Sequence, residues 1–140
     1  MEREPEMRSI ILSVALMFVA VGAWADIDMD KIAMIESSGN PNAYNGRSGA
    51  IGLYQITKIC LDDYNLYNAP VLPRNALWRP EVNEKVAQWY MNKRIPQLLR
   101  YYGHADTIEN RIIAWNAGIK YVGKNVPRET LDYIKKYIDL

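Results

Sequence analysis

Apolar side chains recur at helical spacing in the second half of the chain, and no other feature constrains the fold as strongly. Val82, Val86, Trp89 and Tyr90 stand at positions i, i+4, i+7 and i+8, which is the spacing of one face of an α-helix. No segment shows a sustained alternation with a period of two, the pattern of a half-buried strand. A chain of 140 residues is long enough for one domain. The sequence therefore predicts a single all-α domain.

Capping and turn residues indicate where the helices begin and end. Pro96 should kink or interrupt the long helix described above, because proline cannot donate a backbone hydrogen bond. A last helix is expected from Pro127, a favoured first position, with an apolar stripe of Leu131, Ile134 and Ile138. The remaining helices are expected over residues 26–35, from Gly52 or Thr57 to about Tyr64, and over residues 106–118.

The first 25 residues have the features of a secretory signal peptide. Residues 10–24 are almost wholly apolar and end in the A-x-A pattern Ala23-Trp24-Ala25, which favours cleavage after Ala25. The run is shorter than the ~20 residues that a membrane-spanning helix needs. Residues 1–6 carry three glutamates, so we expect Met7 to be the true start. The mature domain, residues 26–140, would be exported to the periplasm or cell-wall space without stable membrane insertion.

Charge and composition argue against several classes of function. The formal net charge is +1, and no basic block indicates nucleic acid as the main partner. His104 and Cys60 are the only histidine and cysteine and make no ligand cluster, so we expect no metal and no cofactor. Cys60 has no cysteine to pair with and is interpreted as a small buried core residue.

Glu36 is the acidic residue with the most unusual setting. It ends an apolar stretch that contains Ile32 and Ile35, and the turn residues Ser37-Ser38-Gly39-Asn40-Pro41 follow it, which places it in the last turn of a short helix. The partial negative charge of a helix C-terminus and apolar neighbours both raise a carboxyl pKa. A carboxyl group that is protonated at neutral pH is a candidate general acid. The alternative is a solvated surface glutamate.

Five short motifs follow one another along the chain: Glu36-Ser37-Ser38-Gly39-Asn40-Pro41, Gly49-Ala50-Ile51-Gly52-Leu53-Tyr54-Gln55-Ile56, Arg79-Pro80-Glu81-Val82-Asn83, Ala114-Trp115-Asn116-Ala117-Gly118 and Pro127-Arg128-Glu129-Thr130-Leu131-Asp132-Tyr133. In this order they resemble the motifs of the soluble lytic transglycosylase family, whose domain is related to goose-type lysozyme. The resemblance covers nearly all of residues 26–140 and implies a lysozyme-like fold. The family usually has Met where Tyr54 stands and Tyr where Trp115 stands.

The resemblance implies cleavage of the β-1,4 bond between N-acetylmuramic acid and N-acetylglucosamine in peptidoglycan glycan strands. Glu36 would protonate the leaving oxygen and then take the proton of the muramoyl C6 hydroxyl, which closes onto C1. The product would be a 1,6-anhydro sugar, and no water is consumed. Family members that open the wall for secretion or conjugation systems suggest a similar role, and components of such an apparatus as partners, by analogy.

The resemblance also implies which side chains support Glu36. Gln55 and Asn116 would orient N-acetyl groups or brace the loop after Glu36, and Tyr133 would bring its hydroxyl towards the carboxyl group and tune its pKa. For each of them the alternative is ordinary packing or loop hydrogen bonding.

Further candidates lie in the loop and on the walls of the expected cleft. The loop before the second motif is one residue longer than usual, so the family's substrate-contacting serine corresponds to Ser48 or is replaced by Asn45. Tyr54 and Trp115 are expected to stack on sugar rings. Ser37 either caps backbone groups or touches sugar.

Two other functions remain open at this stage. A hydrolytic lysozyme on the same fold would need a positioned water, and most glycosidases use a second carboxylate for that purpose. No second carboxylate is obvious in the sequence, and Glu129 is the candidate to watch because it stands in a family motif. A non-catalytic peptidoglycan-binding assembly module is the other alternative, although a pure binder has no need of an acid in an apolar setting.

Overall fold

Six α-helices make up about half of residues 26–140, the part of the chain that the computed structural model describes. The predicted signal peptide, its cleavage site after Ala25 and the Met7 start lie outside these residues. The described part contains only isolated β-bridges, between single residues of the segment 44–56, and the predicted all-α fold is confirmed. The α-helices are α2 (Met29–Ser37), α3 (Lys58–Tyr67), α4 (Pro80–Trp89), α5 (Ile95–Tyr101), α6 (Ile108–Asn116) and α7 (Arg128–Asp139).

Three short segments complete the helical structure. Two of them are 3₁₀-helices, η2 (Arg74–Trp78) and η4 (Ile119–Tyr121), and the third is a π-helical turn, η3 (Tyr90–Arg94). No helix between residues 26 and 140 is both long enough and apolar enough to cross a membrane.

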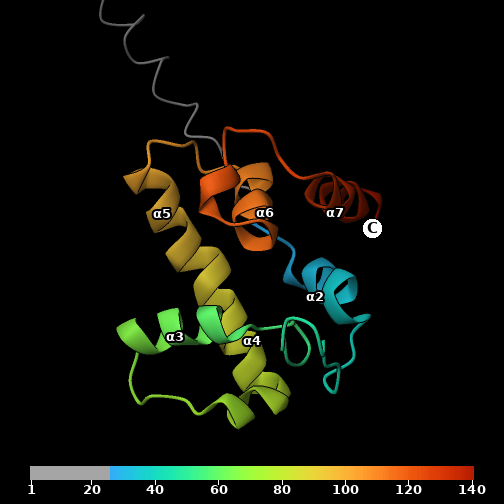
Figure 1. Ribbon diagram of the computed structural model, residues 1–140, viewed down its shortest axis with the longest axis vertical. Helices are drawn as coiled ribbons and strands as arrows, with labels where there is room; N and C mark the ends of the chain where they lie inside the picture. The colour runs from blue at the N-terminus through green and yellow to red at the C-terminus, as the bar shows by residue number, and fades with distance from the viewer. Residues whose placement is uncertain (1–25) are drawn as a thin grey trace, which may run out of the picture.

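Helices α4 and α5 form one continuous column through the molecule (Figure 1), and η3 joins them. Pro96 lies just beyond this π-helical turn, where the N–H of Ile95 bonds to the carbonyl group of Tyr90, five residues back. The α-helical bonding is therefore interrupted, as predicted, while the helix continues. The fully buried side chains of the column are Asn83, Val86, Ala87, Met91, Ile95 and Leu99.

Helix α2 carries Glu36 and packs against α7. It begins at Met29 rather than at residue 26, because the side chain of Asp28 caps the first turn by accepting bonds from the N–H groups of Asp30 and Lys31. Ser38 adopts a left-handed φ of 55° and ends the helix. Glu36 therefore lies in the last turn, as the sequence predicts.

The loop after α2 is fixed by a buried amide on the central column. The Nδ2 of Asn83 donates to the carbonyl oxygens of Ile51 and Leu77, at 2.8 and 3.0 Å, and its Oδ1 accepts from the N–H of Tyr54 at 2.9 Å. Gly52 has a φ of +78°, and a Cβ atom there would lie 2.9 Å from the Leu77 carbonyl oxygen. Glycine is needed at this position because both the backbone angle and the space exclude a side chain.

The sequence left two possible starts for α3, Gly52 and Thr57. The helix begins at Lys58, and the side chain of Thr57 accepts a bond from the N–H of Cys60. Thr57 is therefore the N-cap, and the alternative start at Gly52 is wrong. Helix α6 is capped in the same way by Thr107, and it ends at Asn116, close to the predicted limit.

The buried face of α7 differs from the predicted stripe. Leu131 and Ile138 are exposed, and Ile134 is only partly buried, whereas Thr130, Tyr133 and Tyr137 are buried. The tyrosines bury their rings while their hydroxyl groups keep polar partners, which makes their burial favourable. Hydropathy alone selects the aliphatic face, so the predicted stripe is wrong.

Candidate active site

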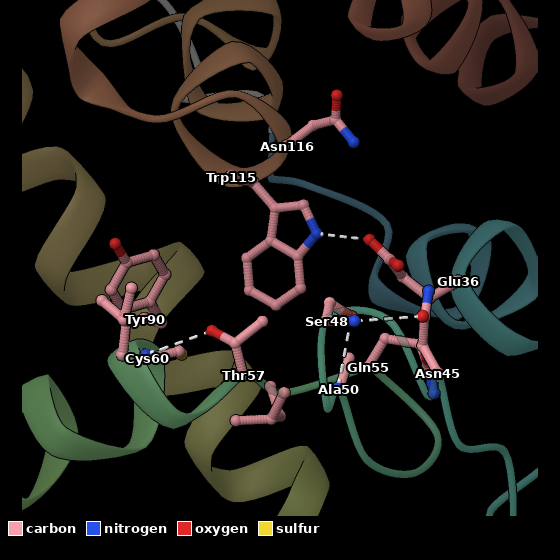
Figure 2. A pocket seen from close by; sticks show the side chains of 12 residues that line it. Glu36, Asn45, Ser48, Ala50, Gln55, Thr57, Cys60, Tyr90, Trp115 and Asn116 are labelled. Atoms are coloured by element: carbon pink, nitrogen blue, oxygen red, sulfur yellow. Dashed lines mark hydrogen bonds between the residues drawn. The ribbon is translucent and has the colours of Figure 1, made fainter.

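A pocket of about 300 Å³ opens beside Glu36. Figure 2 shows it between the end of α6, the start of α3 and the loop that follows α2. Its volume is at the lower end of the range of roughly 300–1,000 Å³ that is usual for ligand pockets. Its walls are formed by Glu36, Asn45, Ser48, Ala50, Gln55, Ile56, Thr57, Ile59, Cys60, Tyr90, Trp115 and Asn116.

One oxygen of the Glu36 carboxyl group receives two hydrogen bonds from distant parts of the chain. The indole N–H of Trp115 donates to Oε1 at 2.8 Å, and the hydroxyl group of Tyr133 donates to the same oxygen at 2.9 Å (Figure 2 shows the first of these bonds). The predicted approach of Tyr133 to Glu36 is confirmed. Within residues 26–140 no buried side-chain polar atom lacks a partner. Since Oε2 makes no hydrogen bond there, it is not fully buried, and Glu36 lines the pocket.

The surroundings of Glu36 favour its neutral form. Burial raises the pKa of its carboxyl group above the ordinary value, and the hydrogen bonds from Trp115 and Tyr133 offset only part of this effect. Burial also raises the pKa of Tyr133, and the adjacent Glu36 raises it further, so this hydroxyl group remains a donor. A buried carboxyl group with a raised pKa and one free oxygen is suited to general acid–base catalysis.

The wall beyond Trp115 is aromatic and uncharged. Tyr90 and Trp115 are in edge-to-face contact, with ring centroids 6.0 Å apart, and burial raises the pKa of Tyr90 to about 12. Cys60 lines the same wall and is partly buried, so its expected place in the fully buried core is only approximately right. Burial raises the pKa of its thiol to about 12, and the thiol is therefore neutral and unreactive at pH 7.

The opposite wall is the loop that carries the second motif. Gln55 has a φ of 51°, which is uncommon for a residue other than glycine, and its Nε2 donates to the carbonyl oxygens of Ala43 and Gly52 at 3.2 and 2.9 Å. It therefore braces this loop, which is one of the two roles expected for it. Ser48 and Asn45 both line the pocket, so the choice between them as the substrate-contacting residue stays open.

Asn116 closes the pocket at the end of α6. Its Oδ1 accepts a hydrogen bond of 2.7 Å from the hydroxyl group of Thr130, which is 1% exposed. This contact fixes the orientation of the amide group, because the oxygen is already used. The Nδ2 donor makes no hydrogen bond within residues 26–140, and Figure 2 shows the side chain at the end of α6, at the edge of the pocket.

Two predicted substrate contacts are wrong. Tyr54 is 1% exposed and belongs to the core, since the bond from its N–H to Asn83 turns this part of the loop inward. It cannot stack on a sugar. Ser37 does not line the pocket, and its Oγ lies 2.7 Å from the carbonyl oxygen of Leu53. Its hydroxyl group joins α2 to the loop, in line with the backbone-capping alternative.

Glu36 is the acidic residue of this pocket. Glu129, the candidate for a second carboxylate, is exposed in the first turn of α7 and does not line the pocket. Among residues 26–140 no group of three or more histidine, cysteine or acidic side chains could hold a metal ion.

A known protein family matches this chain. The family model of the transglycosylase SLT domain matches residues 29–138. The chain belongs to the transglycosylase SLT domain family. The lysozyme-like fold expected from the motifs follows from this membership, as does a function of the peptidoglycan lytic transglycosylase type in general. Comparisons with curated proteins and with solved structures gave no match.

Three residues that build the site of this SLT domain were missed by sequence reasoning. Asn83 and Thr130 position the loop and Asn116, and Tyr90 forms part of the wall. Asn83 and Thr130 stand inside motifs that carry the family resemblance. Their polar side chains within these motifs were the signal that could have identified them as part of the site. Tyr90 was recognised only as part of a helical stripe.

Proposed function

We propose that this SLT domain cleaves the glycosidic bond between N-acetylmuramic acid and N-acetylglucosamine with Glu36 as its single acid–base catalyst. The observation that carries the proposal is the Glu36 carboxyl group, which is buried, has a raised pKa and lines the pocket. Such a group keeps its proton to a higher pH than an ordinary carboxyl group and can donate it to a substrate oxygen.

The reaction proceeds in two proton transfers. Glu36 first gives its proton to the oxygen that links the two sugars, and the bond between this oxygen and C1 of the muramoyl sugar breaks. The resulting carboxylate then takes the proton of the C6 hydroxyl group, and O6 bonds to C1 on the same sugar. The products are a free N-acetylglucosamine end and a 1,6-anhydromuramoyl end, with Glu36 protonated again.

The two donors on Oε1 support the second half of this cycle. Trp115 and Tyr133 donate to the same oxygen, and hydrogen bonds of this kind favour a charged carboxylate. Burial favours the neutral acid, so the two effects oppose each other and keep both states of Glu36 accessible. A group that acts first as acid and then as base requires this balance.

Pocket shape and charge support a glycan as the substrate. The half-buried ring of Trp115 offers an apolar face, while the amides of Gln55 and Asn116 offer polar groups to N-acetyl substituents. The only acid on the walls is Glu36, and the proposed mechanism needs only one. We further propose that the domain is exported to the periplasm or cell-wall space, on the basis of the A-x-A pattern before Asp26. Action for a secretion or conjugation system is proposed by analogy alone.

Product analysis tests this function. Purified peptidoglycan is digested in water enriched in heavy oxygen, and the released muropeptides are analysed by mass spectrometry. We expect anhydro ends, one water lighter than hydrolytic products, without incorporation of heavy oxygen. Reducing ends that carry the label would show a hydrolytic lysozyme instead, and intact peptidoglycan after incubation would contradict an enzymatic function. Glu36→Gln serves as the inactive control.

A further inference from the structure

A second pocket of about 190 Å³ lies where η4 packs against the end of α5. It shares no lining residue with the pocket at Glu36. Neither the family match nor the proposed mechanism gives it a role. Its lining residues are Tyr102, His104, Ile119, Lys120, Val122 and Lys124.

The second pocket is cationic. Two lysines line it, and no acidic residue does. Within residues 26–140 neither Lys120 nor Lys124 forms an ion pair. Asp106, the acid nearest to His104 in the sequence, is bound by Arg111 at 2.6 Å. Two ammonium groups around a concave surface without a counter-charge attract an anionic ligand.

The frame of the pocket is fixed by backbone contacts. The N–H of His104 donates to the carbonyl oxygen of Leu99 at 2.8 Å, and the imidazole ring packs directly on Gly123. A Cβ atom at Gly123, where φ is +74°, would lie 3.3 Å from Cε1 of His104. Val122, the next lining residue, is buried. The lysines therefore stand beside packed residues, His104 and Val122.

Tyr102 lines the second pocket, and Tyr101 and Tyr121 are its neighbours in the chain or in contact with its lining residues. The ammonium group of Lys120 lies 5.1 Å from the ring centroid of Tyr121, a contact that leaves its remaining N–H groups free for a ligand. Tyr101 and Tyr102 are exposed and in edge-to-face contact, with centroids 4.9 Å apart. Exposed tyrosines offer both an apolar face and a hydroxyl group to a ligand that is partly apolar and partly polar.

The two pockets are close along the chain. Asn116 lines the first and Ile119 lines the second, and consecutive Cα atoms are ~3.8 Å apart, so these two Cα atoms are at most about 11 Å apart. An extended peptide of four residues spans roughly 13–14 Å. A peptide of this length is therefore long enough to extend from Asn116, on the wall of the first pocket, to Ile119, on the wall of the second.

We infer that the second pocket binds a carboxylate of the short peptides attached to the muramoyl sugars of peptidoglycan. The inference rests on the proposed function, since it names a part of the same polymer as the second ligand. Lys120 and Lys124 pair with the carboxylate, and Tyr102 contacts the peptide chain. The pocket then favours glycan strands that carry peptides over strands from which the peptides have been removed.

Binding is tested with a ligand that cannot be cleaved. N-acetylmuramyl dipeptide has a free carboxylate and no glycosidic bond, and its binding to the full isotope-labelled chain is followed by NMR. We expect saturable shifts of the backbone amides of residues 119–124 and of His104. Lys120→Gln/Lys124→Gln should weaken this binding roughly four- to twenty-five-fold, since each exposed ion pair contributes about two- to fivefold. Lys85→Gln, an exposed lysine on α4, should leave it unchanged.

Three results would overturn the inference. They are equal binding of the dipeptide in which the carboxylate is amidated, equal binding by the double-lysine variant, and binding of inorganic phosphate as tight as that of the dipeptide. A digestion with peptide-bearing and peptide-free glycan strands separates this failure from failure of the proposed function. Cleavage of both strands at equal rates by the wild-type protein contradicts only the peptide site. Cleavage of neither strand contradicts the proposed catalytic function.

Discussion

Glu36 holds its position with one carboxyl oxygen and leaves the other without a hydrogen bond within residues 26–140. Both donors, Trp115 and Tyr133, converge on Oε1. The arrangement orients the group without using the oxygen that would exchange a proton with substrate. It also leaves a buried carboxyl group in a setting where its charged form costs free energy, as its raised pKa indicates.

Glu36→Gln should abolish cleavage and stabilise the fold at neutral pH. Loss of acid–base catalysis lowers rates by roughly 10²–10⁴. The folded-state pKa of Glu36 lies above its unfolded value of 4.5. Between the two pKa values the folded chain binds more protons, so the free energy of unfolding falls as the pH rises. Glutamine does not titrate, and the variant should gain on the order of 1 kcal/mol at pH 8 over the wild type.

Urea denaturation at pH 4 and at pH 8 measures this gain. At pH 4 the carboxyl group is largely protonated in the folded state, so the two proteins should be nearly equal in stability. Glu109→Gln, an exposed acid in the first turn of α6, is the matched control and should show no gain at pH 8. If the difference in free energy of unfolding between Glu36→Gln and the wild type is the same at pH 4 and at pH 8, the pKa of Glu36 is not raised.

Among the elements, α7 combines a structural and a catalytic contact on one face. Tyr133 and Tyr137 are one turn apart and both are buried. The hydroxyl group of Tyr133 donates to Glu36 in the last turn of α2, whereas that of Tyr137 accepts from the N–H of Asp28 at the first turn, at 2.9 Å. One helix thus holds both ends of α2.

Replacement by phenylalanine should have different effects at the two tyrosines. Tyr133→Phe removes a donor that favours the Glu36 carboxylate, so the pKa of Glu36 should rise and the high-pH limb of the activity profile should move upward by about one pH unit. Tyr137→Phe leaves the N–H of Asp28 without this partner and should cost about 1 kcal/mol of stability. Its activity profile should keep the wild-type shape. Equal shifts of the profile in both variants would show that the effect is merely structural.

The central column of α4, η3 and α5 positions walls of the pocket at Glu36. Asn83 in α4 makes three hydrogen bonds to the loop around Gly52 and to Leu77, and Gln55 in that loop lines the pocket. Tyr90 begins the π-helical turn and lines the opposite wall. Such turns occur often at functional sites. Two walls of the pocket are therefore positioned by one helix.

At the scale of the whole molecule, local sequence signals predicted the elements better than the contacts between them. Helical spacing and capping residues predicted the helices. The turn residues after Glu36 predicted its position in the last turn of α2. The buried face of α7 could not be obtained in this way, because the partners of Tyr133 and Tyr137 lie 97 and 109 residues away. Tyr54 was misplaced for a similar reason, since Asn83 fixes its backbone from another element.

The export hypothesis makes a prediction about the whole chain. Cleavage after Ala25 would leave Asp26 as the first residue and would keep Ile27, which is 5% exposed, and the helix cap Asp28. A chain that starts at Met29 would lose both, at a cost of roughly 1.5–3 kcal/mol for the buried side chain and about 1 kcal/mol for the cap. Residues 26–140 should therefore unfold at a clearly higher urea concentration than residues 29–140.

N-terminal sequencing of the protein recovered outside the cytoplasm gives the direct measurement, and the sequence should begin Asp26-Ile27-Asp28. This start removes the whole apolar run and keeps the buried Ile27 and the helix cap Asp28, which is why we expect cleavage there and not further along. Ala25→Asp, which places a charge in the A-x-A pattern, should block processing and leave the leader attached. If the exported wild-type protein retains Met1 or Met7, it is anchored by its apolar segment and the predicted cleavage is wrong.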